Sequence, residues 1–206
     1  MITFYHAPKS RSTAIAVLIE EMGISDRVDM NLVDIVRADG SGAADPKNPH
    51  PESKAPVLIH DGRLITERGA IMLYLTTLFP DRGMAPAIGT PDWGSLATWL
   101  VWYQGVLEPV LIHAFAGLSH PFLASTFRGP VEAAARIRAA LEKGPWLLGD
   151  QFSAADLLVH SPYAWFEDAT PDDPLIRDWV ERCKARPARL KVLAEDEARM
   201  TSMQRA

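Results

Sequence analysis

The segment KAPVLIHDGRLITERGAIMLYLTTLFP, residues 54–80, predicts a β-hairpin followed by a helix. Two short apolar runs flank Asp61-Gly62, and an Asp-Gly pair favours a tight hairpin turn because both positions tolerate positive φ. Beyond the hairpin, apolar residues at helical spacing predict a helix over about 67–79, and Pro80 ends it. The segment therefore supplies two strands and one helix.

The residues that precede this segment continue the alternation of strands and helices. Residues 2–6 predict a strand, and alternation over 28–32 predicts a second strand. Between them, an apolar face that starts at Ser12 predicts a helix, which Gly23 closes as a C-cap. Residues 37–55 are rich in Gly and Pro, so we expect an irregular stretch there. This order predicts a small α/β layer structure.

The residues that follow the segment predict helices only. Residues 81–92 lose the periodicity, which indicates a domain boundary. Beyond it no stretch has a convincing strand pattern, so the second half is expected to be all-helical. Its helices are expected over 96–111 with a bend at Pro109, over 131–141, from a capping box at Ser153 and Asp156, and over 176–183.

Composition excludes several classes of protein. The chain has 206 residues, of which 48% are hydrophobic and 23% charged, as in an ordinary globular protein. Its apolar runs are too short for a membrane span of ~18 residues, and its first residues do not resemble a signal peptide. The net charge of -5 argues against nucleic-acid binding. A single cysteine excludes an internal disulfide framework and fits a cytoplasmic protein.

Three parts of the sequence resemble one known family. Residues 54–58 and 64–71 resemble the glutathione-binding core of cytosolic glutathione S-transferases. Residues 5–12 resemble the first strand-to-helix turn of the serine-type, bacterial-type members. Residues 146–150 and 152–156 resemble the folding signature of the family's helical domain. The three parts occur in the family's order and with its spacing.

This resemblance implies a fold and an assembly. The fold is an α/β thioredoxin-like N-terminal domain over residues 1–82, a linker over 83–92 and an all-α domain over 93–206. The family also has a helix within the region of 37–50, where the composition alone predicts an irregular stretch. The resemblance further implies a homodimer, glutathione as co-substrate and a small electrophile as second substrate.

The resemblance assigns thiol activation to the turn before the first helix. Ser10 is expected to donate a hydrogen bond to the glutathione thiolate, with Ser12 as the second candidate. The alternative for either serine is a plain helix cap. Arg11 adds positive potential beside the thiolate or remains a solvated side chain. Tyr5 also carries a hydroxyl, but its position inside a strand favours packing in the core.

The same resemblance assigns glutathione recognition to the hairpin segment. Ala55 and a cis Pro56 are expected to present the backbone of Ala55 to the cysteinyl residue, and Lys54 reaches glutathione or is a surface lysine. Glu67 is expected to meet the α-amino group. Arg68 stands where the family commonly has serine, so it pairs with the γ-glutamyl carboxylate or points to solvent.

The sequence also gives expectations for Tyr103, for Cys183 and for metal binding. Tyr103 is expected to line the cleft for the apolar electrophile, with a place in the helical core as the alternative. Cys183 lies in an apolar stripe, which argues against enzyme thiol chemistry. No cluster of His, Cys or Glu has metal-ligand spacing, so no metal is expected.

The function that these expectations favour is a glutathione transferase. In that reaction a glutathione thiolate, stabilised by a serine hydroxyl, attacks a small hydrophobic electrophile. Two further functions stay open: a protein that kept the fold as a binding or scaffold module, and a glutathione-dependent isomerase or peroxidase. Arg68 at a recognition position is the main support for the scaffold.

Overall fold

The computed structural model describes residues 1–203. The chain divides into two compact units. The first comprises Met1–Arg82 together with the segment from Arg186 onward, and the second comprises Gly83–Ala185. The first unit is an α/β structure and the second is helical, which confirms the predicted thioredoxin-like fold followed by helices.

The first unit is built on a four-stranded sheet with the order β2-β1-β3-β4. Strand β1 (Ile2–His6) runs parallel to β2 (Val28–Leu32) and antiparallel to β3 (Val57–His60), and β4 (Arg63–Ile65) pairs with β3. The β3–β4 turn has positive φ at both Asp61 (47°) and Gly62 (79°). These angles are those of the Asp-Gly hairpin that the sequence predicts.

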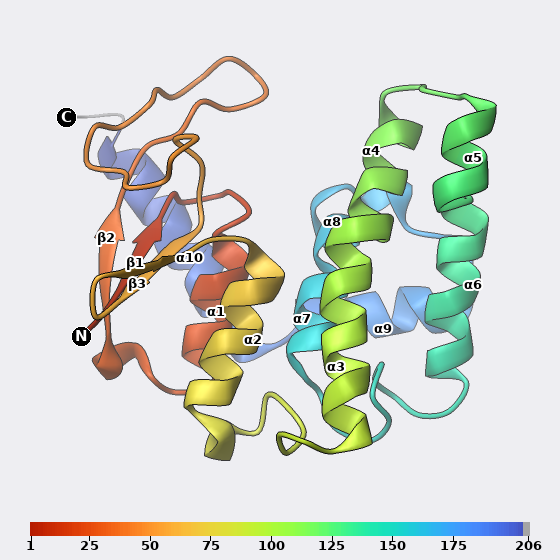
Figure 1. Cartoon of the computed structure of the whole chain (residues 1–206). Coiled ribbons are helices and arrows are strands. Elements are labelled where there is room, and N and C mark those ends of the chain that lie inside the picture. Colours follow the sequence, from red (N-terminus) through yellow and green to blue (C-terminus); the bar gives the residue numbers. More distant parts are fainter. Residues whose placement is uncertain (204–206) are drawn as a thin grey trace. The chain divides into compact units, whose positions relative to one another are not determined.

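Three helices accompany this sheet. Helices α1 (Thr13–Glu21) and α2 (Arg68–Leu78) lie side by side against it in Figure 1. Helix α10 (Pro187–Met203) packs on α1. The buried side chains that join sheet and helices are apolar, as the alternating and helical patterns require. They include Phe4, Ile15, Leu18, Leu58, Ile71 and Leu75.

The segment between β2 and β3 is irregular. Of its described residues, 33–56, none belongs to a helix or a strand, so the family's helix within 37–50 is absent here and the composition-based prediction is confirmed. In this segment side-chain carboxylates accept hydrogen bonds from backbone amides that would bond to backbone carbonyls in a helix. Asp45 Oδ2 accepts from the Asp34 amide at 3.2 Å, and Asp34 Oδ2 accepts from the Ala43 amide at 2.9 Å. Such local side-chain contacts compete with helix formation.

The last helix is attached to the first unit by ion pairs. The Arg186 guanidinium donates to both carboxylate oxygens of Glu21, at 2.5 and 2.6 Å, and Lys191 Nζ lies 2.8 Å from Glu20. The sequence places residues 93–206 in one helical domain, whereas the contacts of α10 put it in the first compact unit. The bounds 1–82, 83–92 and 93–206 stay a prediction about separate folding domains.

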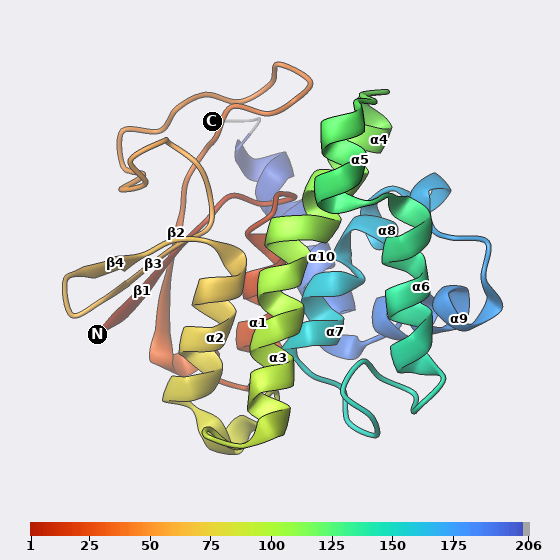
Figure 2. The ribbon, with the colours of Figure 1, turned by 45° about the vertical axis from the view of Figure 1, so that its right-hand side comes forward.

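The second unit begins with a long helix that contains a wide turn. Helix α3 (Pro91–Trp102) continues through a π-helical turn (Tyr103–Leu107) into α4 (Glu108–Phe115). Pro109 has no N–H to donate, and the wide turn just before it accommodates this loss. The other helices of this unit appear in Figure 2. They are α5 (Pro121–Phe127), α6 (Pro130–Leu141), α7 (Ala154–Val159), α8 (Ser161–Trp165) and α9 (Pro174–Lys184).

A buried carboxylate organises the start of α7. Ser153 and Asp156 form the predicted capping box, and Asp156 Oδ2 accepts from the Ser153 amide at 3.0 Å. Asp156 Oδ1 also accepts from the Leu147 amide at 2.8 Å and from Trp179 Nε1 at 3.0 Å. Burial raises the pKa of Asp156, against these hydrogen bonds, which lower it. The carboxylate therefore ties a loop and α9 to the first turn of α7.

Candidate active site

Three loops of the first unit meet at one end of its sheet. Tyr5, near the end of β1, pairs with Val57 at the start of β3, and Ile65 at the end of β4 pairs with Leu58. The loop after β1, the loop before β3 and the start of α2 therefore lie at the same end. These loops carry the predicted glutathione-site residues Ser10, Arg11, Ser12, Lys54, Ala55, Pro56, Glu67 and Arg68.

The loop after β1 holds its two serines at different depths. Ser12 is fully buried at the N-terminus of α1, and its side chain makes no capping hydrogen bond to that helix. Ser10 is half-buried, and its Oγ accepts from the Ser12 amide at 3.1 Å. Only Ser10 presents a hydroxyl near the surface, so the geometry favours it over Ser12 as a donor to a ligand.

The Ser12 hydroxyl lies among protein groups on all sides. Its Oγ accepts from the Ala7 amide at 3.0 Å and lies 2.9 Å from the Ala7 carbonyl oxygen. It also lies 2.9 Å from Ser10 Oγ and 2.7 Å from His6 Nδ1. The buried serine thus connects the half-buried one to a histidine.

Two residues at this site escape sequence reasoning, His6 and Asp196. Both side chains are 0% exposed, and His6 Nε2 lies 2.8 Å from Asp196 Oδ1. Asp196 Oδ2 accepts from the Lys9 amide at 2.9 Å and from Thr13 Oγ1 at 2.7 Å. No local pattern links positions that are 190 residues apart. Only the packing of α10 on α1 brings them together.

The electrostatics of Asp196 follow from these partners. Burial acts to raise the pKa of its carboxyl, but the hydrogen bond from His6, with the donors from Lys9 and Thr13, holds it below the usual value. Arg199 Nη1 adds a cation 3.4 Å from Asp196 Oδ1. The group is therefore a carboxylate at neutral pH.

Cationic side chains surround the loop that carries the serines. Arg11 is exposed beside Ser10, and Arg37 donates to the Pro8 and Lys9 carbonyl oxygens at 3.0 and 3.2 Å. The Lys9 ammonium pairs with Glu197. Together with the N-terminus of α1, the guanidinium groups of Arg11 and Arg37 favour an anion near Ser10.

The other two loops place the predicted recognition residues. The Ala55–Pro56 peptide bond is cis, as the resemblance implied. Lys54 is exposed and pairs with Glu52. Glu67 is exposed at the start of α2, with a φ of 67° that non-glycine residues seldom adopt and that concentrates at functional sites. Arg68 is only 5% exposed, so the alternative that it points to solvent is wrong.

Tyr103 and Cys183 belong to the helical unit. Tyr103 is 2% exposed, and its hydroxyl oxygen lies 3.5 Å from Ser161 Oγ, so the structure favours the core role over the predicted cleft-lining role. Apolar neighbours explain this, since a ring at helical spacing is buried by the bundle. Cys183 is also buried, as its stripe predicts.

Among residues 1–203, no group of three or more His, Cys, Asp and Glu side chains is arranged to hold a metal ion. Within that same range, no helix has the length and apolarity needed to cross a membrane.

Comparison with known proteins finds similar proteins over most of the chain. Residues 1–77 match the family model of the glutathione S-transferase N-terminal domain. The disulfide-bond oxidoreductase YfcG of Escherichia coli (strain K12) is 27% identical over 209 residues, which cover 91% of this chain and 92% of that protein. The glutathione S-transferase GstA of Escherichia coli O157:H7 is 25% identical over 169 residues, 78% of this chain and 80% of that protein.

A solved structure extends the likeness to three dimensions. A glutathione transferase from Methylococcus capsulatus str. Bath is 27% identical, with a TM-score of 0.74 over 96% of this chain and 100% of that one. The family model covers the unit that carries the three loops, and the relatives span most or nearly all of both units. Residues 1–77 therefore match the glutathione S-transferase N-terminal domain, and the chain as a whole is similar to proteins described as glutathione transferases.

Proposed function

We propose that the protein is a glutathione transferase that holds glutathione where the three loops meet and conjugates its thiolate to a small hydrophobic electrophile. The observation that carries the proposal is the half-buried Ser10 hydroxyl at the start of α1, beside a cationic loop. In the reaction the thiolate sulfur forms a bond to an electrophilic carbon, and a leaving group or a π-electron pair departs from that carbon.

Magnitudes show that a serine is sufficient for this task. An ordinary thiol with a pKa of ~8.5 is mostly protonated at pH 7, and lowering that pKa to ~6.5 requires about 2.7 kcal/mol. A hydrogen bond to the anion contributes about 1.5–3 kcal/mol. The N-terminus of α1 adds about 0.3–1 kcal/mol. Ser10 and the helix together therefore meet the requirement.

The remaining loops supply groups for the rest of glutathione. We assign the backbone of Ala55, before Pro56, to the cysteinyl residue, with Lys54 at the edge. Glu67 suits the α-amino group, since a carboxylate pairs with an ammonium. Arg68 and the N-terminus of α2 suit the γ-glutamyl carboxylate. The homodimer stays a prediction of the family resemblance, and the cytoplasmic location stays a prediction from the single cysteine.

Titration of the bound thiol tests the proposal. Ser10→Ala should raise the pKa of bound glutathione by about one to two units, as the loss of one charged hydrogen bond requires. Ser12→Ala should raise this pKa less, because the buried Ser12 would affect the thiolate only through its hydrogen bond with Ser10. The ultraviolet absorbance of the thiolate, followed against pH in both variants, measures the two shifts. The reverse order would transfer the donor role to Ser12.

The oxidoreductase relative favours a second candidate on the same site. There the glutathione thiolate attacks one sulfur of a disulfide, the S–S bond breaks, and the other sulfur leaves as a thiolate. The buried Cys183 argues that glutathione, not an enzyme cysteine, would supply the attacking sulfur. Activity on a small disulfide but not on aryl halides or epoxides would favour this candidate.

A scaffold, an isomerase and a peroxidase each predict a different result with glutathione. A scaffold that had lost the site would not be retained on immobilised glutathione, whereas a transferase would. A glutathione-dependent isomerase or peroxidase would be retained but would turn over isomerisable or hydroperoxide substrates without forming a conjugate. A panel of electrophiles read by mass spectrometry separates these activities.

A further inference from the structure

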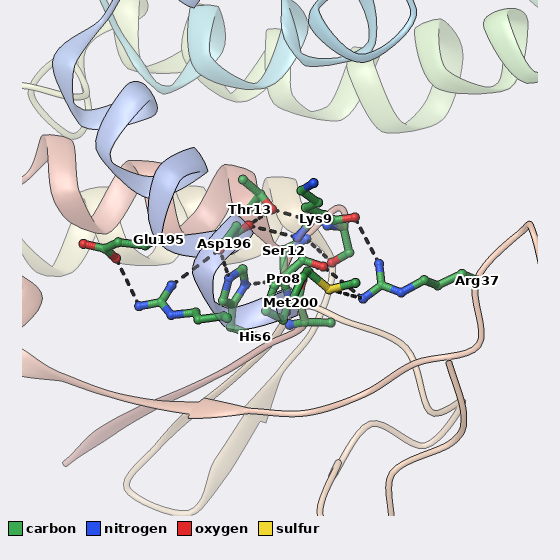
Figure 3. Close-up of polar contacts among 12 residues, drawn as sticks. His6, Pro8, Lys9, Ser12, Thr13, Arg37, Glu195, Asp196 and Met200 are labelled. Atoms are coloured by element: carbon green, nitrogen blue, oxygen red, sulfur yellow. Dashed lines mark hydrogen bonds and ion pairs between the residues drawn. The ribbon is translucent and has the colours of Figure 1, made fainter. Parts of the chain in front are cut away.

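Four side chains of the first unit form an unbroken hydrogen-bonded chain from α10 to the loop after β1. Asp196 Oδ1 lies 2.8 Å from His6 Nε2, and His6 Nδ1 lies 2.7 Å from Ser12 Oγ. Ser12 Oγ lies 2.9 Å from Ser10 Oγ. Figure 3 shows Asp196, His6 and Ser12 at the centre of the polar contacts in this region. Three of the four are fully buried, and only Ser10 approaches the surface.

Asp196, His6 and Ser12 are the residue types of a hydrolase catalytic triad. The burial of Ser12 excludes that role. A nucleophilic serine must contact its substrate, and Ser12 is 0% exposed. Its hydroxyl is suited instead to pass a proton between neighbours. The group that meets a ligand is Ser10, at the outer end.

When His6 is neutral, the hydrogen bonds of Ser12 allow an arrangement of protons that links His6 to Ser10. A hydroxyl has one proton and two lone pairs, and the Ala7 amide occupies one lone pair. A neutral His6 with its proton on Nε2, toward Asp196, leaves Nδ1 as an acceptor. In the arrangement that links the four side chains, the Ser12 proton points to His6 rather than to the Ala7 carbonyl oxygen 2.9 Å away, and the second lone pair of Ser12 accepts the proton of Ser10.

The arrangement reverses when His6 carries a second proton. Nδ1–H then donates to Ser12, whose two lone pairs are filled by His6 and the Ala7 amide. Ser12 donates its own proton to the Ser10 oxygen or the Ala7 carbonyl. The Ser10 proton has no acceptor left on Ser12, so it points away from the protein interior. The same positions of the heavy atoms serve both arrangements.

We propose that His6, held by Asp196, accepts the proton of the bound glutathione thiol through Ser10 and Ser12; this inference rests on the proposed function. The S–H bond breaks as an O–H bond forms on Ser10. The original Ser10 proton moves to Ser12, and the Ser12 proton moves to His6 Nδ1. The products are a thiolate that accepts from Ser10 and an imidazolium paired with the Asp196 carboxylate.

The groups around His6 suit an imidazolium. Asp196 faces its Nε2 from α10, and Phe4 stacks on it from β1 with ring centroids 5.5 Å apart. The cations near Asp196 are themselves engaged: Arg199 pairs with Glu195 at 3.0 Å, and Lys9 pairs with Glu197. Arg37 contacts the Pro8 and Lys9 carbonyl oxygens on the loop. His6 and Asp196 act through the two serines and are positioning residues.

Nuclear magnetic resonance of the His6 ring tests the transfer directly. In the glutathione complex near neutral pH, both ring nitrogens of His6 should be protonated, and this signal should appear together with the thiolate absorbance as glutathione is added at constant pH. With S-methylglutathione, which has no thiol proton, His6 should stay neutral under the same conditions. The same ring state with both ligands would overturn the proposal.

A double-mutant cycle separates a relay from a charge effect through space. His6→Phe should raise the pKa of bound glutathione by about one unit, a tenfold change in ionisation. In a Ser12→Ala background, where the chain is already broken, His6→Phe should change that ionisation less than about twofold. Equal effects in both backgrounds would contradict the relay. If His6→Phe does not fold, the resonance comparison repeated in Ser12→Ala decides, because the link between ring and thiolate should be lost there.

These outcomes also distinguish the inference from the proposed function. A low thiol pKa that rises in Ser10→Ala but is insensitive to His6 overturns the relay alone. Absence of glutathione binding by the wild-type protein overturns both.

Discussion

The two compact units each bury an aspartate at the centre of a hydrogen-bond network, and the two networks differ in one respect. Asp156 in the helical unit and Asp196 in the α/β unit are both 0% exposed. The donors to Asp156 are backbone amides, an indole and a hydroxyl, all of them neutral. Asp196 instead faces an imidazole and, at longer range, a guanidinium.

The pKa values of the two carboxyl groups separate accordingly. Burial dominates at Asp156 and raises its pKa. At Asp196 burial acts in the same direction, but the partners, His6 first, outweigh it and the pKa is lowered. Because its donors are neutral, the network around Asp156 serves to hold the loop, α7 and α9 together. The imidazole of His6 connects the second network, through Ser12, to the half-buried Ser10.

Removal of the Asp156 carboxylate should give the largest effect on stability. Asp156→Ala leaves buried donors from Leu147, Ser153 and Trp179 without their acceptor, so we expect a loss of about 3 kcal/mol or more. Ser153→Ala, the matched control, should cost about 1 kcal/mol as the loss of a helix cap. Denaturant unfolding measures both. Equal losses would contradict a wider role for Asp156 than the capping box.

The pH dependence of stability should have opposite signs for the two aspartates. The lowered pKa of Asp196 contributes stability above its unfolded value of about 3.9, and this is lost as the pH falls through the folded pKa. The raised pKa of Asp156 contributes stability below about 3.9, and this is lost as the pH rises through the folded pKa.

Variants make this difference measurable. The stability of the wild-type protein relative to Asp196→Asn should therefore increase with pH across the acid range, and relative to Asp156→Asn it should decrease. Urea unfolding at several pH values gives both slopes. Slopes of the same sign would contradict opposite pKa shifts of Asp156 and Asp196.

A smaller effect is expected for Arg68, which we assign to the γ-glutamyl carboxylate of glutathione. Arg68→Ala should weaken glutathione binding by about tenfold, the ~1.4 kcal/mol of a charged hydrogen bond, and Arg68→Ser should recover part of it. Wild-type affinity should also fall with rising salt. Calorimetry that finds unchanged affinity in Arg68→Ala would remove Arg68 from the site.

Lys54→Ala removes an exposed side chain paired with Glu52 and should change the free energy of unfolding by less than about 0.5 kcal/mol.

Sequence reasoning reached the sheet, the helices and the loop of Ser10 because hairpin turns, helical stripes and caps are local signals. It did not find His6 and Asp196, because their contact depends on the packing of α10 on α1. It assigned residues 93–206 to one helical domain without marking a separate helix over 187–203, so the packing of α10 on α1 was not predicted. The burial of Arg68 and Tyr103 likewise follows from tertiary packing.

A structure of the protein with bound glutathione tests the central claim most directly. The account predicts that the sulfur lies about 3.0–3.5 Å from Ser10 Oγ, at hydrogen-bond distance, and farther from the buried Ser12 Oγ. A sulfur nearest to Ser12 or Tyr5, or a ligand bound away from the three loops, would contradict it.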